Sequence, residues 1–146
     1  MKTCCSEETA KTMAPALIRW GIGLLLFTSG AGKIPKIAGF AQGIASRFEE
    51  TILPAWMVMP YGYVLPFVEL LVGLTLILGL MRNAVLFLAG ITFLSLAFGQ
   101  MLLKGHATVA NILVYLFMVA IALFLSKYDR WCVFGGNATK PVSDQA

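Results

Sequence analysis

Charged residues are scarce in this chain of 146 residues. They make up 12% of it, whereas a typical soluble domain is about 25% charged. Hydrophobic residues make up 59%, and the mean hydropathy is +0.83. This composition predicts an integral membrane protein whose first partner is the lipid bilayer. The net charge of +4 indicates membrane topology and a preference for anionic lipids, and nucleic acid is not an expected partner.

Residues that commonly carry redox or hydrolytic chemistry are also few. A single histidine excludes bis-histidine haem ligation within the chain. The sequence has no CxxC, no Ser-His-Asp arrangement and no dinucleotide fingerprint. Seven methionines and three cysteines form no tight ligand cluster, and methionine commonly fills gaps between helices. We therefore expect no metal site and no cofactor within the chain, and we assign no catalytic residue.

The stretch "TSGAGKIPK", which starts at Thr28, resembles a phosphate-binding loop only superficially. A Walker A loop needs a glycine five residues before its Gly-Lys pair and a Ser or Thr after the lysine. Phe27 and Ile34 occupy those positions. The stretch also follows a long apolar segment rather than a short buried strand. We interpret it as the end of a membrane helix, where Gly30 and Gly32 allow close helix packing and Lys33 reaches the interface. Gly21 and Gly23 are expected to allow close helix packing earlier in that span.

Four apolar runs are long enough to cross a bilayer, whose core of about 30 Å takes about 20 helical residues. They are Pro15 to Gly32, Tyr61 to Met81, Asn83 to Leu103 and Gly105 to Ser126. Because the apolar residues are continuous rather than alternating, strands are not expected. We predict an all-α, four-helix membrane bundle over residues 14–128. A polar leader (1–13) precedes it and a C-terminal tail (129–146) follows.

Positive charges in short loops set the orientation of membrane helices. With four spans, both termini share one side of the membrane. That side holds Lys2, Lys11, Arg19, Arg82, Lys127, Arg130 and Lys140, against Lys33, Lys36, Arg47 and Lys104 on the other. The bias predicts cytoplasmic termini. Cys4, Cys5 and Cys132 would then lie in a reducing compartment, where disulfides are rare.

The segment between the first and second spans is longer than a turn requires. Its apolar residues recur every three or four positions at Ile37, Phe40, Ile44, Phe48 and Ile52, which predicts one stripe of an amphipathic helix. We expect this helix to lie in the membrane interface, with Trp56 and Tyr61 as aromatic anchors. The alternative is that it forms a lid over an opening between helices.

Polar side chains at membrane depth are costly when unpaired, so their positions indicate structural or binding sites. Helix depths predict a cluster in the outer half of the bundle, formed by Glu69, Lys33, Gln100, His106 and Asn111. Arg19 enters from the opposite side.

A buried carboxylate without a nearby cation takes up a proton, so an ionised Glu69 needs a cation within reach. Lys33 is the expected partner because it lies at the nearest depth in the bundle. Structural and ligand-holding roles for this cluster both stay open.

The order Arg19, Gly23, Phe27, Gly30 and Lys33, followed by a Glu-x-x-x-Gly-x-x-x-x-x-Gly pattern that starts at Glu69, resembles the DoxX family. The resemblance extends over about residues 14–128. It implies a four-helix bundle in a bacterial inner membrane. Relatives in that family include a subunit of thiosulfate:quinone oxidoreductase.

Two functions follow as hypotheses. The first is a small membrane subunit associated with an oxidoreductase or electron-transfer complex, with a quinone as the candidate ligand near Glu69. The alternative is a noncatalytic structural or assembly subunit of a larger membrane complex. Both predict other membrane-protein subunits as partners.

Overall fold

The computed structural model describes residues 3–49 and 51–128, and this part of the chain is entirely helical. Its helices are α1 (Thr3–Lys33), α2 (Ile37–Phe48), α3 (Ala55–Leu78), α4 (Arg82–Leu102) and α5 (His106–Leu125). Short 3-10 turns follow α1 (Ile34–Lys36) and α5 (Ser126–Tyr128). Four stretches within the described residues are long and apolar enough to cross a membrane. The predicted class, an all-α four-helix membrane bundle, is confirmed.

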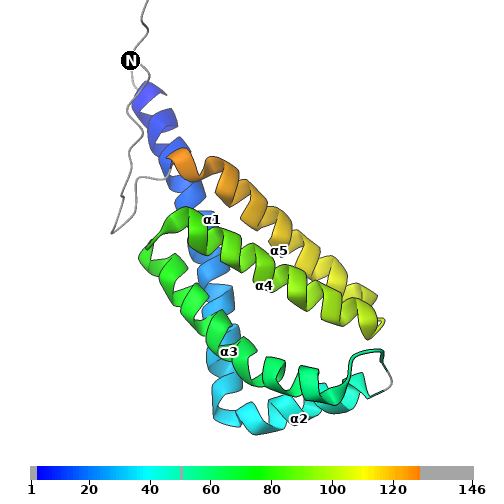
Figure 1. The fold of residues 1–146 in the computed structure, drawn as a ribbon. Coiled ribbons are helices and arrows are strands. Elements are labelled where there is room, and N and C mark those ends of the chain that lie inside the picture. Colours follow the sequence, from blue (N-terminus) through cyan, green and yellow to red (C-terminus); the bar gives the residue numbers. More distant parts are fainter. Residues whose placement is uncertain (1–2, 50, 129–146) are drawn as a thin grey trace, which may run out of the picture.

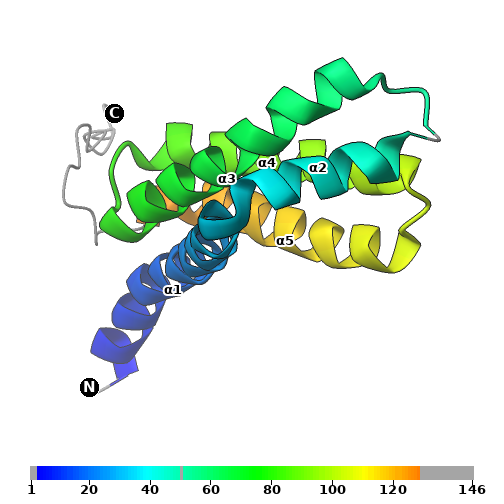
Figure 2. The ribbon, with the colours of Figure 1, turned by 90° about the horizontal axis from the view of Figure 1, so that it is seen from below.

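The helices form two antiparallel pairs (Figure 1). The first pair is α1 with α3, and the second is α4 with α5. Helix α2 lies along the first half of α3 at one end of the molecule, which we call the α2 end (Figure 2). The other end, which we call the terminal end, holds the last turn of α5 and the α3–α4 turn (Figure 1).

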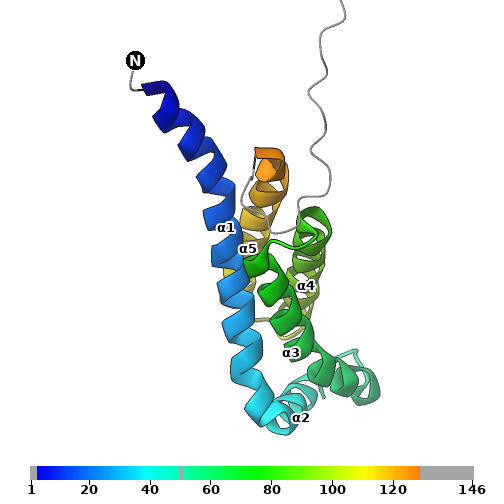
Figure 3. The same cartoon turned by 90° about the vertical axis from the view of Figure 1, so that its left-hand side faces the viewer.

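Helix α1 continues past the terminal end of the bundle (Figure 3). Its 31 residues correspond to about 46 Å at 1.5 Å per residue, more than a bilayer core of about 30 Å. Residues 3–13, the expected polar leader, belong to this helix. Cys4 and Cys5 therefore lie on helical backbone, whereas Cys132 is outside the described residues.

The core lies where the four long helices meet. Leu26 of α1, Leu76 of α3, Leu86 and Ala89 of α4 and Ala122 of α5 are all at most 2% exposed. Every long helix therefore buries one apolar face against the others. The opposite faces carry exposed leucine, valine and phenylalanine side chains, as expected for helices surrounded by lipid.

The turn between α3 and α4 is fixed by a glycine. Gly79 adopts φ 72°, and its N–H donates to the carbonyl of Leu76. The next N–H, that of Leu80, donates to the carbonyl of Thr75. These two hydrogen bonds are typical of a helix that ends with a residue in the left-handed backbone conformation. Glycine adopts that conformation without strain. The chain therefore reverses within a few residues and begins α4 at Arg82.

Close contact between α1 and α3 depends on three glycines. A Cβ atom at Gly30 would lie 2.6 Å from the carbonyl oxygen of Pro66, and one at Gly23 would lie 3.0 Å from the carbonyl oxygen of Gly73. A Cβ atom at Gly73 would collide with the backbone nitrogen of Phe27. The expected packing roles of Gly30 and Gly23 are confirmed.

The same expectation is wrong for Gly32 and Gly21. Nothing lies within 4 Å of a Cβ atom built at either position. Both residues are exposed because they lie on the faces of α1 that turn away from α3.

Helix α2 forms where the sequence predicts a helix, and its buried face lies beside the predicted apolar stripe and shares Phe48 with it. Ala41, Ala45 and Phe48 are buried, whereas Ile37 and Ile44 are only partly covered. The alanine face of α2 packs against α3 at Gly62, which has no side chain. A Cβ atom at Gly62 would lie only 3.0 Å from the Cα atom of Ala41. Ile52, expected on the stripe, follows the helix and is 92% exposed. Backbone proximity to α3 thus decides which face is buried.

Candidate functional site

A fully buried acidic group, the carboxylate of Glu69, lies near the middle of α3. The residue is 1% exposed. Its Oε2 atom lies 2.6 Å from the Nζ atom of Lys33 on α1. The Ser29 hydroxyl donates a second hydrogen bond to the same oxygen at 3.2 Å. We call these three residues the α1–α3 polar centre. The ion pair that depth arguments predicted is therefore present.

Helical spacing and close packing together place these groups. Ser29 and Lys33 are four residues apart and so share one face of α1. Gly30 lies between them and lets the backbone of α1 approach Pro66 and Leu70, on either side of Glu69 in the sequence of α3. With the two backbones this close, a serine and a lysine from α1 both reach the carboxylate.

Lys33 also connects α2 to the centre. Its Nζ atom lies 5.2 Å from the centre of the Phe40 ring on α2, a distance at which a cation is attracted to an aromatic face. The Lys33 side chain is 24% exposed, whereas that of Glu69 is 1% exposed. The cation thus lies at the boundary of the protein, between a buried carboxylate and an aromatic ring.

Arg19 is fully buried but lies away from this centre. Its guanidinium donates to the carbonyl oxygen of Leu76 at 2.6 Å, two helical turns along α3 from Glu69. Leu76 lies in the last turn of α3, where carbonyl groups carry partial negative charge and favour cations. Arg19 therefore caps α3 at the terminal end of the bundle.

The other predicted cluster members do not join the polar centre in the described structure. Gln100 is partly buried near the end of α4, and its Oε1 atom lies 2.8 Å from the position that a Cβ atom would take at Gly105. His106 and Asn111 are exposed on α5. Depth places these residues at the α2 end with Lys33, but their helix faces separate them from Glu69. A ligand-binding role for them stays a prediction.

A second polar contact was not expected from the sequence. The hydroxyls of Tyr61 on α3 and Ser95 on α4 lie 2.9 Å apart. This contact joins α3 of the first helix pair to α4 of the second. The sequence predicts Tyr61 as an interfacial anchor, and the residue is exposed. Its spacing of about two turns from Glu69 on the same helix is the only sequence signal that it could also contact another helix.

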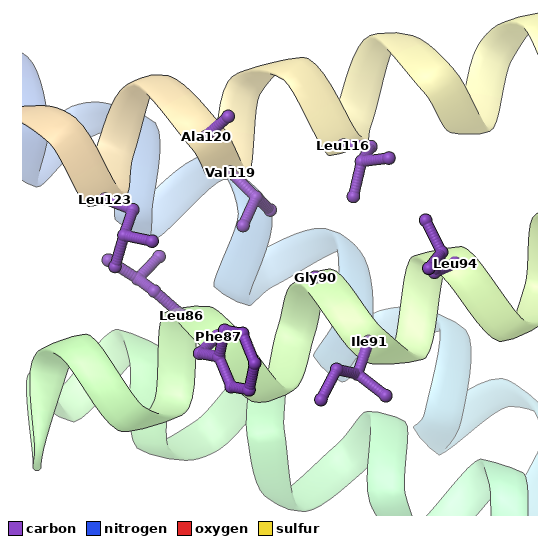
Figure 4. Close-up of a pocket in the computed structure, with 9 residues that line it drawn as sticks. All are labelled: Leu86, Phe87, Gly90, Ile91, Leu94, Leu116, Val119, Ala120 and Leu123. Atoms are coloured by element: carbon purple, nitrogen blue, oxygen red, sulfur yellow. The ribbon is translucent and has the colours of Figure 1, made fainter.

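Among the described residues, no group of three or more His, Cys, Asp or Glu side chains could hold a metal ion. A pocket lies between α4 and α5, away from the α1–α3 polar centre, and nine apolar residues line it (Figure 4).

A comparison with protein-family models shows which family this chain resembles. Residues 11–107 match the model of the methylamine utilisation protein MauE. The chain belongs to the MauE family. No match was found among curated proteins or among solved structures.

The family match corrects the resemblance to DoxX. That resemblance rests on glycines at helical spacing, on Phe27, and on one acidic residue with two cations, Arg19 and Lys33. In the structure, Gly23, Gly30 and Gly73 permit helix contact, and Lys33 neutralises Glu69. Any tightly packed membrane bundle with a buried acid has these requirements, so the pattern does not separate one such family from another.

Proposed function

We propose that this MauE-family chain is a small membrane subunit that serves an oxidoreductase system of methylamine utilisation. The family match carries the proposal. The carbon of methylamine is highly reduced, so its use as a nutrient requires an oxidation step. The four apolar spans support a membrane location for the component, and a bacterial inner membrane is the location we propose.

The polar centre favours an assembly role over direct chemistry. Glu69 accepts hydrogen bonds from Lys33 and Ser29, and Lys33 also faces Phe40. These groups satisfy one another within the chain and connect α1, α2 and α3. We propose that the centre holds these three helices in the arrangement that a partner subunit recognises.

A bound quinone is the finer hypothesis, and it needs an apolar slot that ends in one or two polar groups. The Tyr61–Ser95 hydroxyl pair is the best candidate for such a polar end, because it lies between the two helix pairs and is partly exposed. Extraction of the purified chain with organic solvent, followed by chromatography, tests for a quinone directly.

Growth on methylamine tests the proposed function. We expect a strain that lacks this chain to lose growth on methylamine as nitrogen source and to keep growth on ammonium. A plasmid copy of the wild-type gene should restore growth, and Lys33→Met should restore it poorly because the polar centre is broken. Lys36→Met, at an exposed position on the same side, is the matched control. Normal growth of the deletion strain on methylamine would contradict the proposal.

The proposed topology places both termini in the cytoplasm. A membrane-impermeant maleimide added to intact cells should therefore leave Cys4, Cys5 and Cys132 unlabelled, and the same reagent should label them after the cells are opened. The measurement is mass spectrometry of the purified chain. Labelling in intact cells would show that the termini lie outside the cytoplasm, because these three are all the cysteines in the sequence.

A further inference from the structure

Helix α3 changes its packing partner along its length (Figure 1). Its first half packs against α2, where a Cβ atom at Gly62 would lie 3.0 Å from the Cα atom of Ala41. Its second half packs against α1, where a Cβ atom at Gly30 would lie 2.6 Å from the carbonyl oxygen of Pro66. The change of partner therefore falls between Gly62 and Pro66.

Helix α3 lacks a backbone hydrogen bond at this same place. In a regular helix the N–H of residue 66 donates to the carbonyl of Gly62, but Pro66 lies inside α3 and has no N–H. Bends in helices commonly occur at prolines. Residues 62–66 are therefore a weak point of α3, and the 3-10 turn Ile34–Lys36 is the corresponding joint between α1 and α2. We call α2 together with residues 55–65 the α2 arm.

Two side chains of the α2 arm contact α4. The hydroxyls of Tyr61 and Ser95 lie 2.9 Å apart. The Cζ atom of Phe48 lies 3.5 Å from the position that a Cβ atom would take at Gly99. Ser95 and Gly99 are four residues apart on α4 and so share one face. Both contacts therefore hold the arm against the same face of α4.

The hydroxyl contact costs little to break. The Ser95 hydroxyl has one proton, and it donates to the carbonyl of Thr92 at 2.8 Å. Tyr61 is therefore the donor between the two hydroxyls. When the arm moves away, Ser95 keeps its bond to Thr92, and Tyr61, which is 39% exposed, donates to water or to lipid headgroups. Phe48 adds no hydrophobic force toward closure, because lipid tails are as apolar as its neighbours in the bundle.

We propose that the α2 arm turns about residues 62–66 and separates the first half of α3 from α4. This motion opens the Tyr61 and Ser95 hydroxyls to a lipid-soluble molecule whose head forms hydrogen bonds. The identity of that molecule as a quinone rests on the proposed function, whereas the motion does not. The α1–α3 polar centre lies beside the hinge, since Glu69 follows Pro66 by less than one helical turn, and it keeps the base of the arm in place.

Pulsed electron paramagnetic resonance of the full chain in lipid nanodiscs measures this motion. One spin label is placed at Gly43 on α2 and the other at Phe117 on α5, both exposed positions, and serine replaces the native cysteines. We expect the wild type to populate a shorter and a longer distance. Tyr61→Phe removes the hydroxyl donor and should raise the ratio of the longer to the shorter distance about three-fold, which is typical of one polar contact in a membrane bundle.

Three variants separate the hinge from general effects of substitution. Pro66→Ala supplies the missing N–H and should lower the same ratio. Pro60→Ala makes the same chemical change inside the arm and should leave the ratio unchanged. Thr92→Val, which removes a hydroxyl that donates to the carbonyl of Leu88 on the same helix, should also leave it unchanged. Circular dichroism shows whether each variant folds, and the conservative Tyr61→Phe keeps the test decisive if Pro66→Ala does not.

The same distance ratio in the wild type, Tyr61→Phe and Pro66→Ala would overturn the proposal. A second pair of labels, at Gly21 on α1 and Phe117 on α5, should keep one distance in all variants. An equal change at that pair would also overturn the proposal, because the whole bundle would then be loosening. Addition of decylubiquinone tests the ligand separately. Without a response in the wild type the quinone hypothesis fails, while the comparison of the variants still decides whether the arm moves.

Discussion

Replacing Gly73 by alanine is expected to destabilise the bundle more than any other single methyl addition to the α1–α3 interface. The new Cβ atom would collide with the backbone nitrogen of Phe27 and lie 2.7 Å from the carbonyl oxygen of Gly23. Backbone atoms cannot move aside as a flexible side chain can. The two helices must therefore separate, and we expect the free energy of unfolding to fall by about 3 kcal/mol.

The matched control for this prediction is Gly21→Ala on α1. Nothing lies within 4 Å of a Cβ atom there, and alanine favours a helix over glycine by about 1 kcal/mol. Gly21→Ala should therefore unfold at the same denaturant concentration as the wild type or at a higher one. Unfolding of both variants in mixed detergent, followed by circular dichroism, provides the comparison. Equal stability of Gly73→Ala and Gly21→Ala would mean that α1 and α3 do not approach as closely as described.

Lys33→Met is expected to destabilise the bundle because it leaves the buried carboxylate of Glu69 without its cation. Ser29 still donates one hydrogen bond, but the carboxylate must then take up a proton or remain an uncompensated charge in apolar surroundings. Adding Glu69→Gln to Lys33→Met should recover part of the loss, since a neutral amide needs no cation. We expect a coupling free energy of about 1 kcal/mol, because couplings measured inside membrane bundles are modest.

A double-mutant cycle on the free energy of unfolding measures this coupling. Lys36→Met, combined with the same Glu69→Gln, is the control cycle and should be additive because Lys36 is exposed and makes no described contact with Glu69. Strict additivity of Lys33→Met and Glu69→Gln would show that Glu69 is neutral, or is stabilised by groups other than Lys33.

The amino-acid sequence by itself determined how far along its helix each residue lies. Helix rise is constant at 1.5 Å per residue, so the lengths of the apolar runs specified four spans. The same constancy matched Lys33 to Glu69 by depth, and the structure places them 2.6 Å apart. Composition specified the membrane as the solvent, because a chain with 12% charged residues cannot cover itself with polar groups.

Only the tertiary structure decided which way each side chain points around its helix axis. Gly30 and Gly32 are equally plausible packing positions in the sequence, but α3 approaches the side of α1 that bears Gly30. Arg19 caps α3 at Leu76 rather than approaching Glu69, and His106 and Asn111 face outward at the depth expected of them. In a soluble protein the polar face of a helix marks the side exposed to water. A membrane helix is apolar on all sides, so only the neighbouring helices determine its rotation.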